Sequence, residues 1–371
     1  MSAIVETIAR RGAAEPPTVF SLSPAVRLSR QLARLTTRDG FTLLIGADVV
    51  VDTPALKHLV DNDALIITDA GDRPLVAWTS AVEAELLRNA FATGRLPLQP
   101  PCRTARAGSF DFASGLKKRE LFQAFALDAT PVRTAEDALY YASYKGVTDI
   151  VTKYAWPRPA LVVVRACTAL GISPNMVTVV SILLSIVALP LFVMGHLLLG
   201  LLCAWGMTFL DTVDGKLARV TVSYSSFGNY FDHIPDLLFP PLWWLAYMAG
   251  LQVFEPPSID ASLWTCFWIV IASYVVGRLC EGAFTLRHKF EPFVWRPSDA
   301  RFRLVLARRN PNLLILTGAV LIGQATLGYY VLAAWCGICA LVQLWNFAEA
   351  EVARSRRGRL TSFLQDAPVA S

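Results

Sequence analysis

The pattern of apolar and polar positions changes character near the middle of the chain. Before residue 172, short apolar runs alternate with polar residues, as expected for the strands and amphipathic helices of a water-soluble domain. From Ile172 onward, long apolar segments are separated by short polar connectors. A helix needs about 20 mostly apolar residues to cross a bilayer. The pattern therefore predicts an amino-terminal α/β domain followed by an all-α membrane domain.

Six segments of the second half are long and apolar enough to be predicted as membrane-crossing helices. The last two almost touch, which predicts a tight turn near Gly328. We divide the chain into an α/β domain at 1–140, a linker with a juxtamembrane helix at 141–171, a six-span domain at 172–355 and a basic tail at 356–371. The predicted spans are 175–195, 197–217, 230–250, 262–286, 312–329 and 330–351.

The first half shows the alternation of strands and helices that is typical of an α/β layer fold. Residues 41–52 predict one buried strand that ends in an acid, with a helix beginning at Thr53. Residues 134–145 predict a helix capped by Thr134. Further strands are predicted at 64–69 and 73–80.

The linker contains a short amphipathic pattern at 160–170, with Arg165 on it. Basic and aromatic residues beside an apolar face suit a helix that lies on the cytoplasmic leaflet. A plain linker is the alternative that so short a pattern leaves open.

Lysine and arginine are distributed unequally among the predicted connectors. The connectors after the first, third and fifth spans contain neither residue. The positive-inside rule therefore places both termini and the connector at 218–229 in the cytoplasm. No signal-peptide core is found at the amino terminus, so we expect a multi-pass protein of the inner (plasma) membrane with its first domain in the cytoplasm. The basic residues lie after the fourth span (Arg287, Lys289, Arg296, Arg301, Arg303, Arg308, Arg309) and after the sixth (Arg354, Arg356, Arg357, Arg359).

Four aspartates lie at the predicted cytoplasmic ends of the second and third spans. Asp211 and Asp214 share one helix face, and Asp232 and Asp236 share another, because residues three or four apart lie on the same side of a helix. Four converging carboxylates repel one another and resist burial unless positive charge lies among them. Oxygen ligands without histidine or thiol select Mg²⁺ or Mn²⁺, and two such ions would balance the charge.

The residues between these aspartates suit a diphosphate substrate. Gly215, Ala218 and Gly228 are small where the two faces meet, which lets a bulky ligand approach the backbone. Arg219 supplies a fixed positive charge for a diphosphate. Metal pairs about 4 Å apart are a recurrent device for displacement at phosphorus, so the pattern indicates phosphoryl-transfer chemistry.

The complete spacing Asp211-x2-Asp214-Gly215-x2-Ala218-Arg219-x8-Gly228-x3-Asp232-x3-Asp236 resembles the signature of the CDP-alcohol phosphotransferases. The six-span layout is similar to that family, and Pro174-Asn175-x2-Thr178 resembles the usual start of its first helix. The resemblance covers about residues 145–355.

The resemblance implies a membrane enzyme of phospholipid biosynthesis. It would move the substituted phosphoryl group of a CDP-linked donor, such as CDP-diacylglycerol, onto an alcohol acceptor and release CMP. It also implies a homodimer, and no nucleic-acid partner is expected. The resemblance assigns Asp211, Asp214, Asp232 and Asp236 to the metals, Asp236 also to the general base, and Asn175, Thr178, Asp214, Gly215, Ala218, Arg219 and Gly228 to the CDP pocket.

An acceptor or phosphate site is expected near three arginines. Arg278 lies with Glu281 in the cytoplasmic third of the fourth span, and an arginine at that depth needs an anionic partner. Arg308 and Arg309 lie on the same side of the membrane, and a guanidinium fork suits a phosphate. The alternatives are an Arg278–Glu281 pair and ordinary topological charge.

The first half resembles, more distantly, a sugar-phosphate nucleotidyltransferase, in residues 45–52 and 132–142. That fold needs a glycine-rich loop, and residues 19–37 contain no glycine, so we expect a degenerate domain that does not make the CDP donor. Asp48 is either a relic of a metal site or a residue that starts a turn.

Two other functions remain open at this point. The fused domain suggests an enzyme that joins CDP-inositol to inositol phosphate. A transporter or a non-catalytic scaffold would also retain intramembrane acids, but here the acids gather at one edge and form no relay across the membrane.

Overall fold

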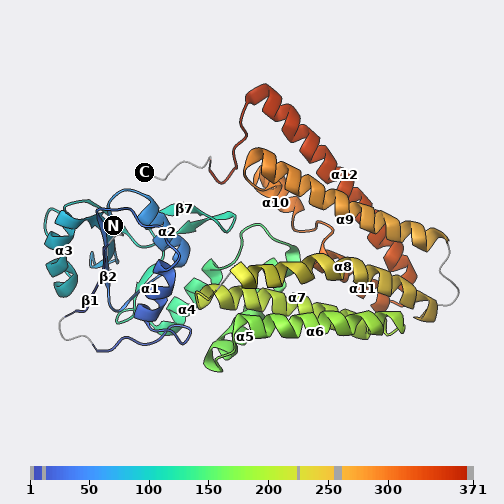
Figure 1. Ribbon diagram of the computed structural model, residues 1–371, viewed down its shortest axis with the longest axis horizontal. Helices are drawn as coiled ribbons and strands as arrows, with labels where there is room; N and C mark the ends of the chain where they lie inside the picture. The colour runs from blue at the N-terminus through green and yellow to red at the C-terminus, as the bar shows by residue number, and fades with distance from the viewer. Residues whose placement is uncertain (1–3, 11–13, 224–225, 255–260, 366–371) are drawn as a thin grey trace.

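The chain folds into two parts that lie end to end along the long axis of the molecule (Figure 1). The computed structural model describes residues 4–10, 14–223, 226–254 and 261–365, and for 226–237 only the path of the helix. Residues 4–142 form a sheet with covering helices, which we call the sheet domain. Residues 174–357 form a bundle of long helices, which we call the helical bundle.

The sheet domain is built on a mixed five-stranded sheet of order β1-β2-β5-β4-β6. β1 pairs in parallel with β2, β5 is antiparallel to both β2 and β4, and β4 pairs in parallel with β6. Two small sheets, β3 with β9 and β7 with β8, extend it. The strands are β1 (Ile4–Ile8), β2 (Phe41–Gly46), β3 (Val49–Val51), β4 (Leu65–Thr68), β5 (Pro74–Ser80), β6 (Arg103–Arg106), β7 (Asp111–Ser114), β8 (Lys118–Leu121) and β9 (Ala124–Ala126).

Helices cover both faces of this sheet, which confirms the predicted α/β character. Successive side chains of a strand point to opposite faces, and β2 shows this: Leu43 and Ile45 pack with α1 and α2, whereas Leu44 packs with α3. Every one of these three leucine or isoleucine side chains is buried. The helices are α1 (Pro24–Leu32), α2 (Thr53–Asp61), α3 (Ala81–Thr93) and α4 (Val132–Ala142).

Two predictions for this half were wrong in detail. Residues 41–52 form two strands in different sheets, because the chain turns between Gly46 and Val49. Asp48 lies in that turn, and its carboxylate accepts a hydrogen bond from Arg73 at 2.6 Å. The last helix begins at Val132 with Pro131 as its N-cap, so Thr134 lies inside the helix and does not cap it.

Within the described residues, the helical bundle contains six helices that overlap the six predicted spans. A π-helical turn η1 (Val151–Ala155) and α5 (Pro157–Ala169) lead into it, and η2 (Pro292–Val294) and α10 (Pro297–Phe302) interrupt it. Its core is rich in aromatic residues, with Trp243, Tyr247 and Tyr329 fully buried. The bundle helices are α6 (Pro174–Val193), α7 (Leu197–Val220), α8 (Ser226–Phe254), α9 (Ala261–His288), α11 (Arg309–Leu321) and α12 (Ala325–Arg357).

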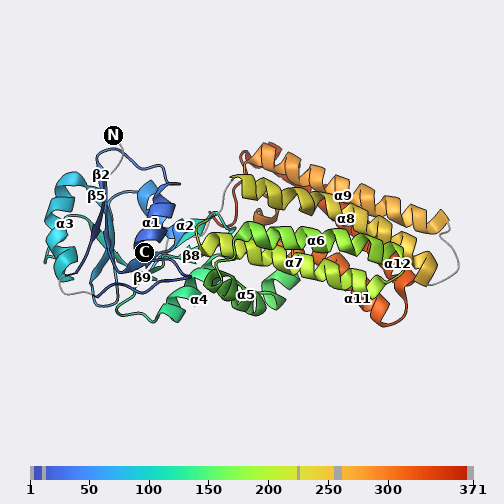
Figure 2. The same cartoon turned by 60° about the horizontal axis from the view of Figure 1, so that its bottom comes forward.

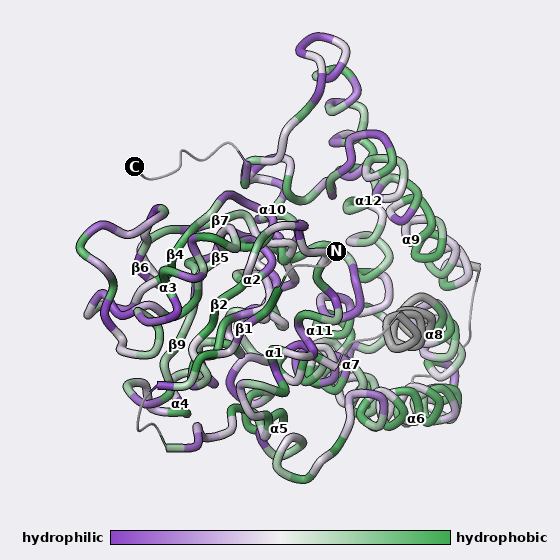
Figure 3. The backbone as a smooth tube through the Cα atoms, turned by 60° about the vertical axis from the view of Figure 1, so that its left-hand side comes forward, coloured by the Kyte–Doolittle hydropathy of each residue, from purple (hydrophilic) through white to green (hydrophobic). Residues whose placement is uncertain are grey.

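Four bundle helices among the described residues are long and apolar enough to cross a membrane: α6, α7, α9 and α12. Their outward faces carry large apolar side chains, such as Leu183, Trp268 and Trp345, that a bilayer would cover. Figure 3, seen along the bundle, shows apolar residues running along most of these helices. The predicted span 230–250 lies within α8, whose first part is outside the described side chains.

The predicted boundary between the last two spans was wrong. The chain turns at residues 322–324, where Gly323 adopts a φ of 71°, and not near Gly328. Gly328 instead lies within α12, where a Cβ would come 2.2 Å from the Cβ of Ala319 on α11. At about 1.5 Å per residue, the 13 residues of α11 are shorter than a hydrocarbon core of about 30 Å. The count of six membrane crossings therefore stays a prediction.

An apolar cluster joins the sheet domain to the bundle. It brings Leu139 and Tyr140 of α4 against Val164 of α5 and against Val213 and Leu217 of α7. The predicted helix at 160–170 is thus confirmed as α5, and its Arg165 bonds to Glu136 and Asp137 of α4. Figure 2 shows α4 near the sheet and α5 alongside the end of α7 that faces the sheet domain. This packing brings the sheet domain to the end of α7 that carries the aspartates.

Candidate active site

One large cavity lies where the sheet domain meets the helical bundle. Its volume is about 1730 Å³, well above the roughly 300–1,000 Å³ of a pocket for one small molecule. Ten lysine or arginine residues and six aspartate or glutamate residues are among the described residues that line it. The excess of positive charge suits anionic ligands. The predicted site residues that line it are Asn175, Thr178, Asp211, Asp214, Gly215, Ala218, Arg219, Arg278, Arg308 and Arg309.

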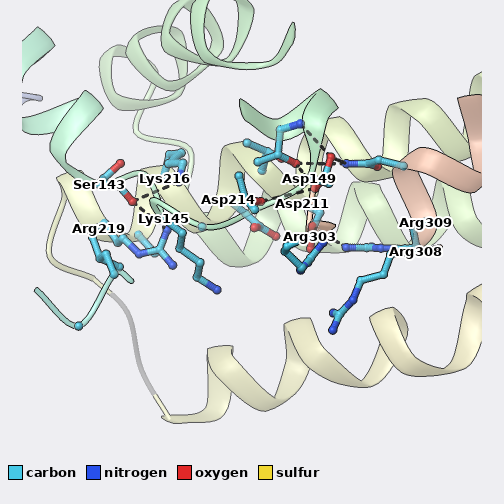
Figure 4. A pocket seen from close by; sticks show the side chains of 18 of the residues that line it. Ser143, Lys145, Asp149, Asp211, Asp214, Lys216, Arg219, Arg303, Arg308 and Arg309 are labelled. Atoms are coloured by element: carbon cyan, nitrogen blue, oxygen red, sulfur yellow. Dashed lines mark hydrogen bonds and ion pairs between the residues drawn. The ribbon is translucent and has the colours of Figure 1, made fainter. Parts of the chain in front are cut away.

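The end of α7 presents Asp211 and Asp214 to this cavity (Figure 4). Asp214 is 3% exposed, and its Oδ2 accepts a hydrogen bond from the Thr178 hydroxyl at 2.6 Å. Thr178 lies near the start of α6, which begins at Pro174. Ser173 caps this helix, because its hydroxyl accepts a hydrogen bond from the N–H of Met176. The α6 start therefore orients the second aspartate of the motif.

Asp211 is held from the opposite side by α11. The Nη2 of Arg309 donates to its Oδ2 at 2.9 Å. Arg309 is placed by its neighbour Asn310, whose side chain donates to Asp149 of the linker at 2.9 Å. Asp149 also accepts from the backbone N–H of Thr152, so η1 and the start of α11 are tied together. The two aspartates are thus directed by two different helices.

The donor chemistry of this site fits a hard divalent cation. Asp211 and Asp214 offer carboxylate oxygens on one helix face, the ligand type that Mg²⁺ and Mn²⁺ prefer. Among the side chains that the structure describes, no three acidic, histidine or cysteine residues gather into a metal-binding cluster. The predicted partners Gly228, Asp232 and Asp236 lie on α8, in the stretch whose side chains are outside the description.

The arginines predicted for the acceptor line the cavity but already have carboxylate partners. Arg308 binds both oxygens of Glu281, and Arg278 lies 3.6 Å from the same carboxylate. The arginine that sequence analysis missed is Arg303, which it counted only as topological charge. The Nη1 of Arg303 is buried without a hydrogen-bond acceptor among the described residues. Burial and the nearby charge of Arg308 lower the pKa of Arg303, so an anion beside it would be stabilised.

The sheet domain holds the last turn of α7. The carbonyl oxygen of Ser143 accepts from Lys216 at 3.1 Å and from Arg219 at 3.4 Å. Arg27 of α1 donates to the carbonyl of Val220 at 2.7 Å, and Arg30 donates to that of Thr221 at 2.7 Å. These carbonyls have no partner within the helix, so the two arginines cap it.

The capped end of α7 leads into an unfavourable backbone conformation. Val222 follows with a φ of 50° and is fully buried. A β-branched residue rarely adopts a left-handed conformation, which costs about 1–3 kcal/mol. Such a conformation persists where the surroundings impose it, and here the N–H of Val222 donates to the carbonyl of Arg219 at 3.2 Å.

Asp52 leads to a prediction about the dependence of stability on pH. It lines the cavity, and burial together with the charge of Glu120 raises its pKa from 3.8 to about 7. The unfolded chain then ionises at lower pH than the folded chain, so this carboxyl destabilises the fold increasingly as pH rises from about 4 to about 7. We expect Asp52→Asn to raise the melting temperature of the detergent-purified chain at pH 8 and to change it little at pH 4.5. Parallel pH profiles for the two proteins would contradict this assignment.

A comparison with known families bears on the same region. Residues 171–297 match the family model of the CDP-alcohol phosphatidyltransferases. This stretch is a CDP-alcohol phosphatidyltransferase domain. The matched residues include the whole run from Asp211 to Asp236, so the family resemblance read from the sequence is confirmed. The phosphatidyltransferase domain begins just before α6 and ends at the start of α10.

A curated relative points in the same direction. The archaetidylinositol phosphate synthase of Pyrococcus horikoshii is 36% identical to this chain over 75 residues. The match covers 20% of this chain and 39% of the relative, so the chain spans well under half of the relative's length. The similarity therefore concerns part of each protein.

The phosphatidyltransferase domain alone does not line the whole cavity. Lys145 and Asp149 come from the linker, Lys57 comes from α2, and Arg303 and Arg309 follow the matched stretch. Sequence analysis did not assign Lys145, Asp149 or Arg303 to the site, since no motif marks them. The packing of the sheet domain against α7, together with the bond from Asn310 to Asp149, brings the linker residues near the aspartates.

Proposed function

We propose that this protein is a membrane phosphotransferase that moves the substituted phosphoryl group of a CDP-linked donor onto an alcohol and releases CMP. The observation that carries the proposal is the cavity, which is lined by Asp211, Asp214 and Arg219 of the family motif and by Arg303. Among the described residues, the buried Nη1 of Arg303 has no hydrogen-bond acceptor. The family match and the relative support phospholipid synthesis as the setting, with CDP-diacylglycerol as the first donor to test.

The four aspartates would hold one or two divalent ions, Mg²⁺ or Mn²⁺. When bound, the ions would supply Lewis-acid stabilisation of the negative charge on the donor diphosphate. Thr178 keeps Asp214 directed at the cavity, and Arg309 does the same for Asp211. Asp236 is our candidate for the base that takes the proton of the acceptor hydroxyl as it attacks phosphorus.

The nucleotide would lie along the last turns of α7. Gly215 leaves this helix face open, because the nearest atom to a Cβ there would be a guanidinium nitrogen of Arg219 at 3.8 Å. Asn175, Ala218 and Arg219 line the same part of the cavity. Gly228 is proposed to complete it from α8.

For the acceptor we propose an alcohol that itself carries a phosphate, such as a polyol phosphate. The relative's name specifies a phosphate-bearing inositol lipid, and Arg303 here has a buried N–H that meets no acceptor in the part of the chain that the structure describes. Arg278 and Arg308 share Glu281, so their net charge near the cavity is also positive. An anionic head group would satisfy this excess.

Arg303→Gln tests the acceptor assignment. A charged hydrogen bond contributes about 1.5–3 kcal/mol, so we expect the KM for a phosphorylated acceptor to rise about tenfold to a hundredfold. The KM for the CDP donor should change little, because Arg303 lies on the far side of the aspartates from Arg219 (Figure 4). Arg301→Gln, an exposed neighbour outside the cavity lining, is the matched control. A rise in donor KM alone would contradict the assignment.

The reaction itself is tested by CMP release from the purified chain in lipid nanodiscs with Mg²⁺ or Mn²⁺. CDP-diacylglycerol and CDP-inositol would each be paired with glycerol phosphate, inositol, inositol phosphate, serine and a diacylglycerol. Turnover with one pair that is lost in Asp236→Asn would establish the function and name the acceptor. CDP-inositol turnover would favour the polyol alternative. Transport or partner binding that survives Asp236→Asn, without CMP release, would favour a transporter or scaffold.

We propose that the enzyme lies in the inner membrane with both termini and the cavity on the cytoplasmic side. The uneven distribution of lysine and arginine among the connectors between helices supports this orientation. In this orientation, water-soluble acceptors in the cytoplasm would reach the cavity from the side of the sheet domain. A homodimer is proposed from the family alone.

A further inference from the structure

The segment between α4 and η1 places one lysine beside the nucleotide-binding part of the cavity. Lys145 lines the cavity, as do Arg219 and the aspartates of α7 (Figure 4). It belongs neither to the family motif nor to the stretch that matches the family. Its position comes from the sheet domain, through α4.

The backbone on both sides of Lys145 is fixed. Two residues before it, the carbonyl of Ser143 accepts hydrogen bonds from Lys216 and Arg219 of α7. Directly after it, the N–H of Gly146 donates to the carbonyl of Leu116 at 2.9 Å. A Cβ at Gly146 would lie 2.6 Å from the carbonyl oxygen of Lys117, so the chain is packed closely against the β7–β8 turn. Lys145 is therefore held in place by contacts with two other elements.

The positive charge around Lys145 favours the binding of an anion. Burial, then Lys117 and Arg219, lower the pKa of Lys145, and these outweigh the opposing charges of Glu291 and Asp211. Lys117 is already paired with Glu291 at 2.5 Å. In the part of the chain that the structure describes, the ammonium group of Lys145 makes no hydrogen bond or ion pair. A cation beside other cations is stabilised when an anion binds among them.

The position of Lys145 indicates which anion it would bind. Figure 4 shows Lys145 beside Arg219 and Lys216, on one side of Asp211 and Asp214, whereas Arg303, Arg308 and Arg309 lie on the other side. The Arg219 side is where we place the nucleotide. We propose that Lys145 binds a phosphate of the CDP-linked donor, so that the linker completes the nucleotide pocket. This inference rests on the proposed function.

The test is isothermal titration of CDP and of cytidine into the full-length protein in detergent with Mg²⁺. Three variants are compared with the wild type: Lys145→Gln, Lys145→Arg and Lys153→Gln. Lys153 is the matched control, since it lies in the same linker, is exposed, rests against Tyr154 and does not line the cavity. Lys145→Gln should weaken CDP binding about tenfold or more, as expected for a lost charged hydrogen bond. Lys145→Arg should retain most of the affinity, and cytidine should bind all four proteins alike.

The outcomes separate this inference from the proposed function. If the wild type binds no CDP, the proposed function itself fails. If Lys145→Gln binds CDP as the wild type does, or loses CDP and cytidine equally, Lys145 is not a phosphate ligand. If Lys145→Gln leaves CDP binding intact but raises the KM of a phosphorylated acceptor, the lysine belongs to the acceptor and the inference is overturned.

Discussion

Asp214→Asn is expected to lower the rate of CMP release at least about a thousandfold. Losses of this size follow when an enzyme loses a group that stabilises charge in the transition state. Asp214 is almost fully buried, and Thr178 bonds to one of its oxygens. Asparagine retains an oxygen that can accept this bond, so the fold should persist while the negative charge is lost. The measurement is kcat in nanodiscs, together with the melting temperature without added metal.

Asp72→Asn is the matched control for this change. Its carboxylate is exposed and pairs with Arg106, and neither residue lines the cavity. Asp72 has a φ of 60°, which asparagine tolerates as well as aspartate. We expect its activity to equal that of the wild type. Retention of more than about a tenth of the activity in Asp214→Asn would contradict a role for this carboxylate in metal-assisted transfer.

Removal of divalent metal is the second change with a large expected effect. Chelation should abolish CMP release, and added Mg²⁺ or Mn²⁺ should restore it, because the carboxylates of Asp211 and Asp214 and the donor diphosphate would repel one another without a cation between them. Binding of metal to the folded state only should also raise the melting temperature by a few degrees at saturation.

The chelator needs its own control. A chelator loaded beforehand with Mg²⁺ should leave both rate and melting temperature unchanged, and a monovalent salt of equal ionic strength should not replace Mg²⁺. In Asp214→Asn the metal-dependent rise in melting temperature should shrink or vanish. Full activity in excess chelator would exclude the metal-assisted reaction proposed for this cavity.

The membrane half was readable from the sequence because two strong patterns coincide there. Long apolar runs identify helices by length, and the spaced aspartates identify one face of α7. The turn between the last two helices was placed incorrectly at Gly328, because glycine serves close packing as well as turns. Here Gly328 packs against Ala319, and Gly323 makes the turn.

The residues outside the family motif that line or support the cavity could not be predicted from the sequence. Lys145, Arg27 and Arg303 are ordinary basic residues in sequence terms, and nothing in their spacing refers to Asp211. Their roles depend on tertiary contacts across more than 70 residues, such as the bonds from Lys216 and Arg219 to Ser143. Likewise, no local pattern indicated that Arg308 would be paired with Glu281 while a buried N–H of Arg303 would have no acceptor among the described side chains.

The capping of α7 by Arg27 and Arg30 has a consequence for the order of assembly. The bonds join residues 193 and 191 positions apart, and the arginines are synthesised first. Since domains generally fold in order from the amino terminus during synthesis, we expect α1 to be in place when α7 leaves the ribosome. The end of that helix then docks onto a finished surface. Moving the sheet domain to the carboxyl end of the chain would reverse this order and leave the helix end uncapped throughout membrane insertion.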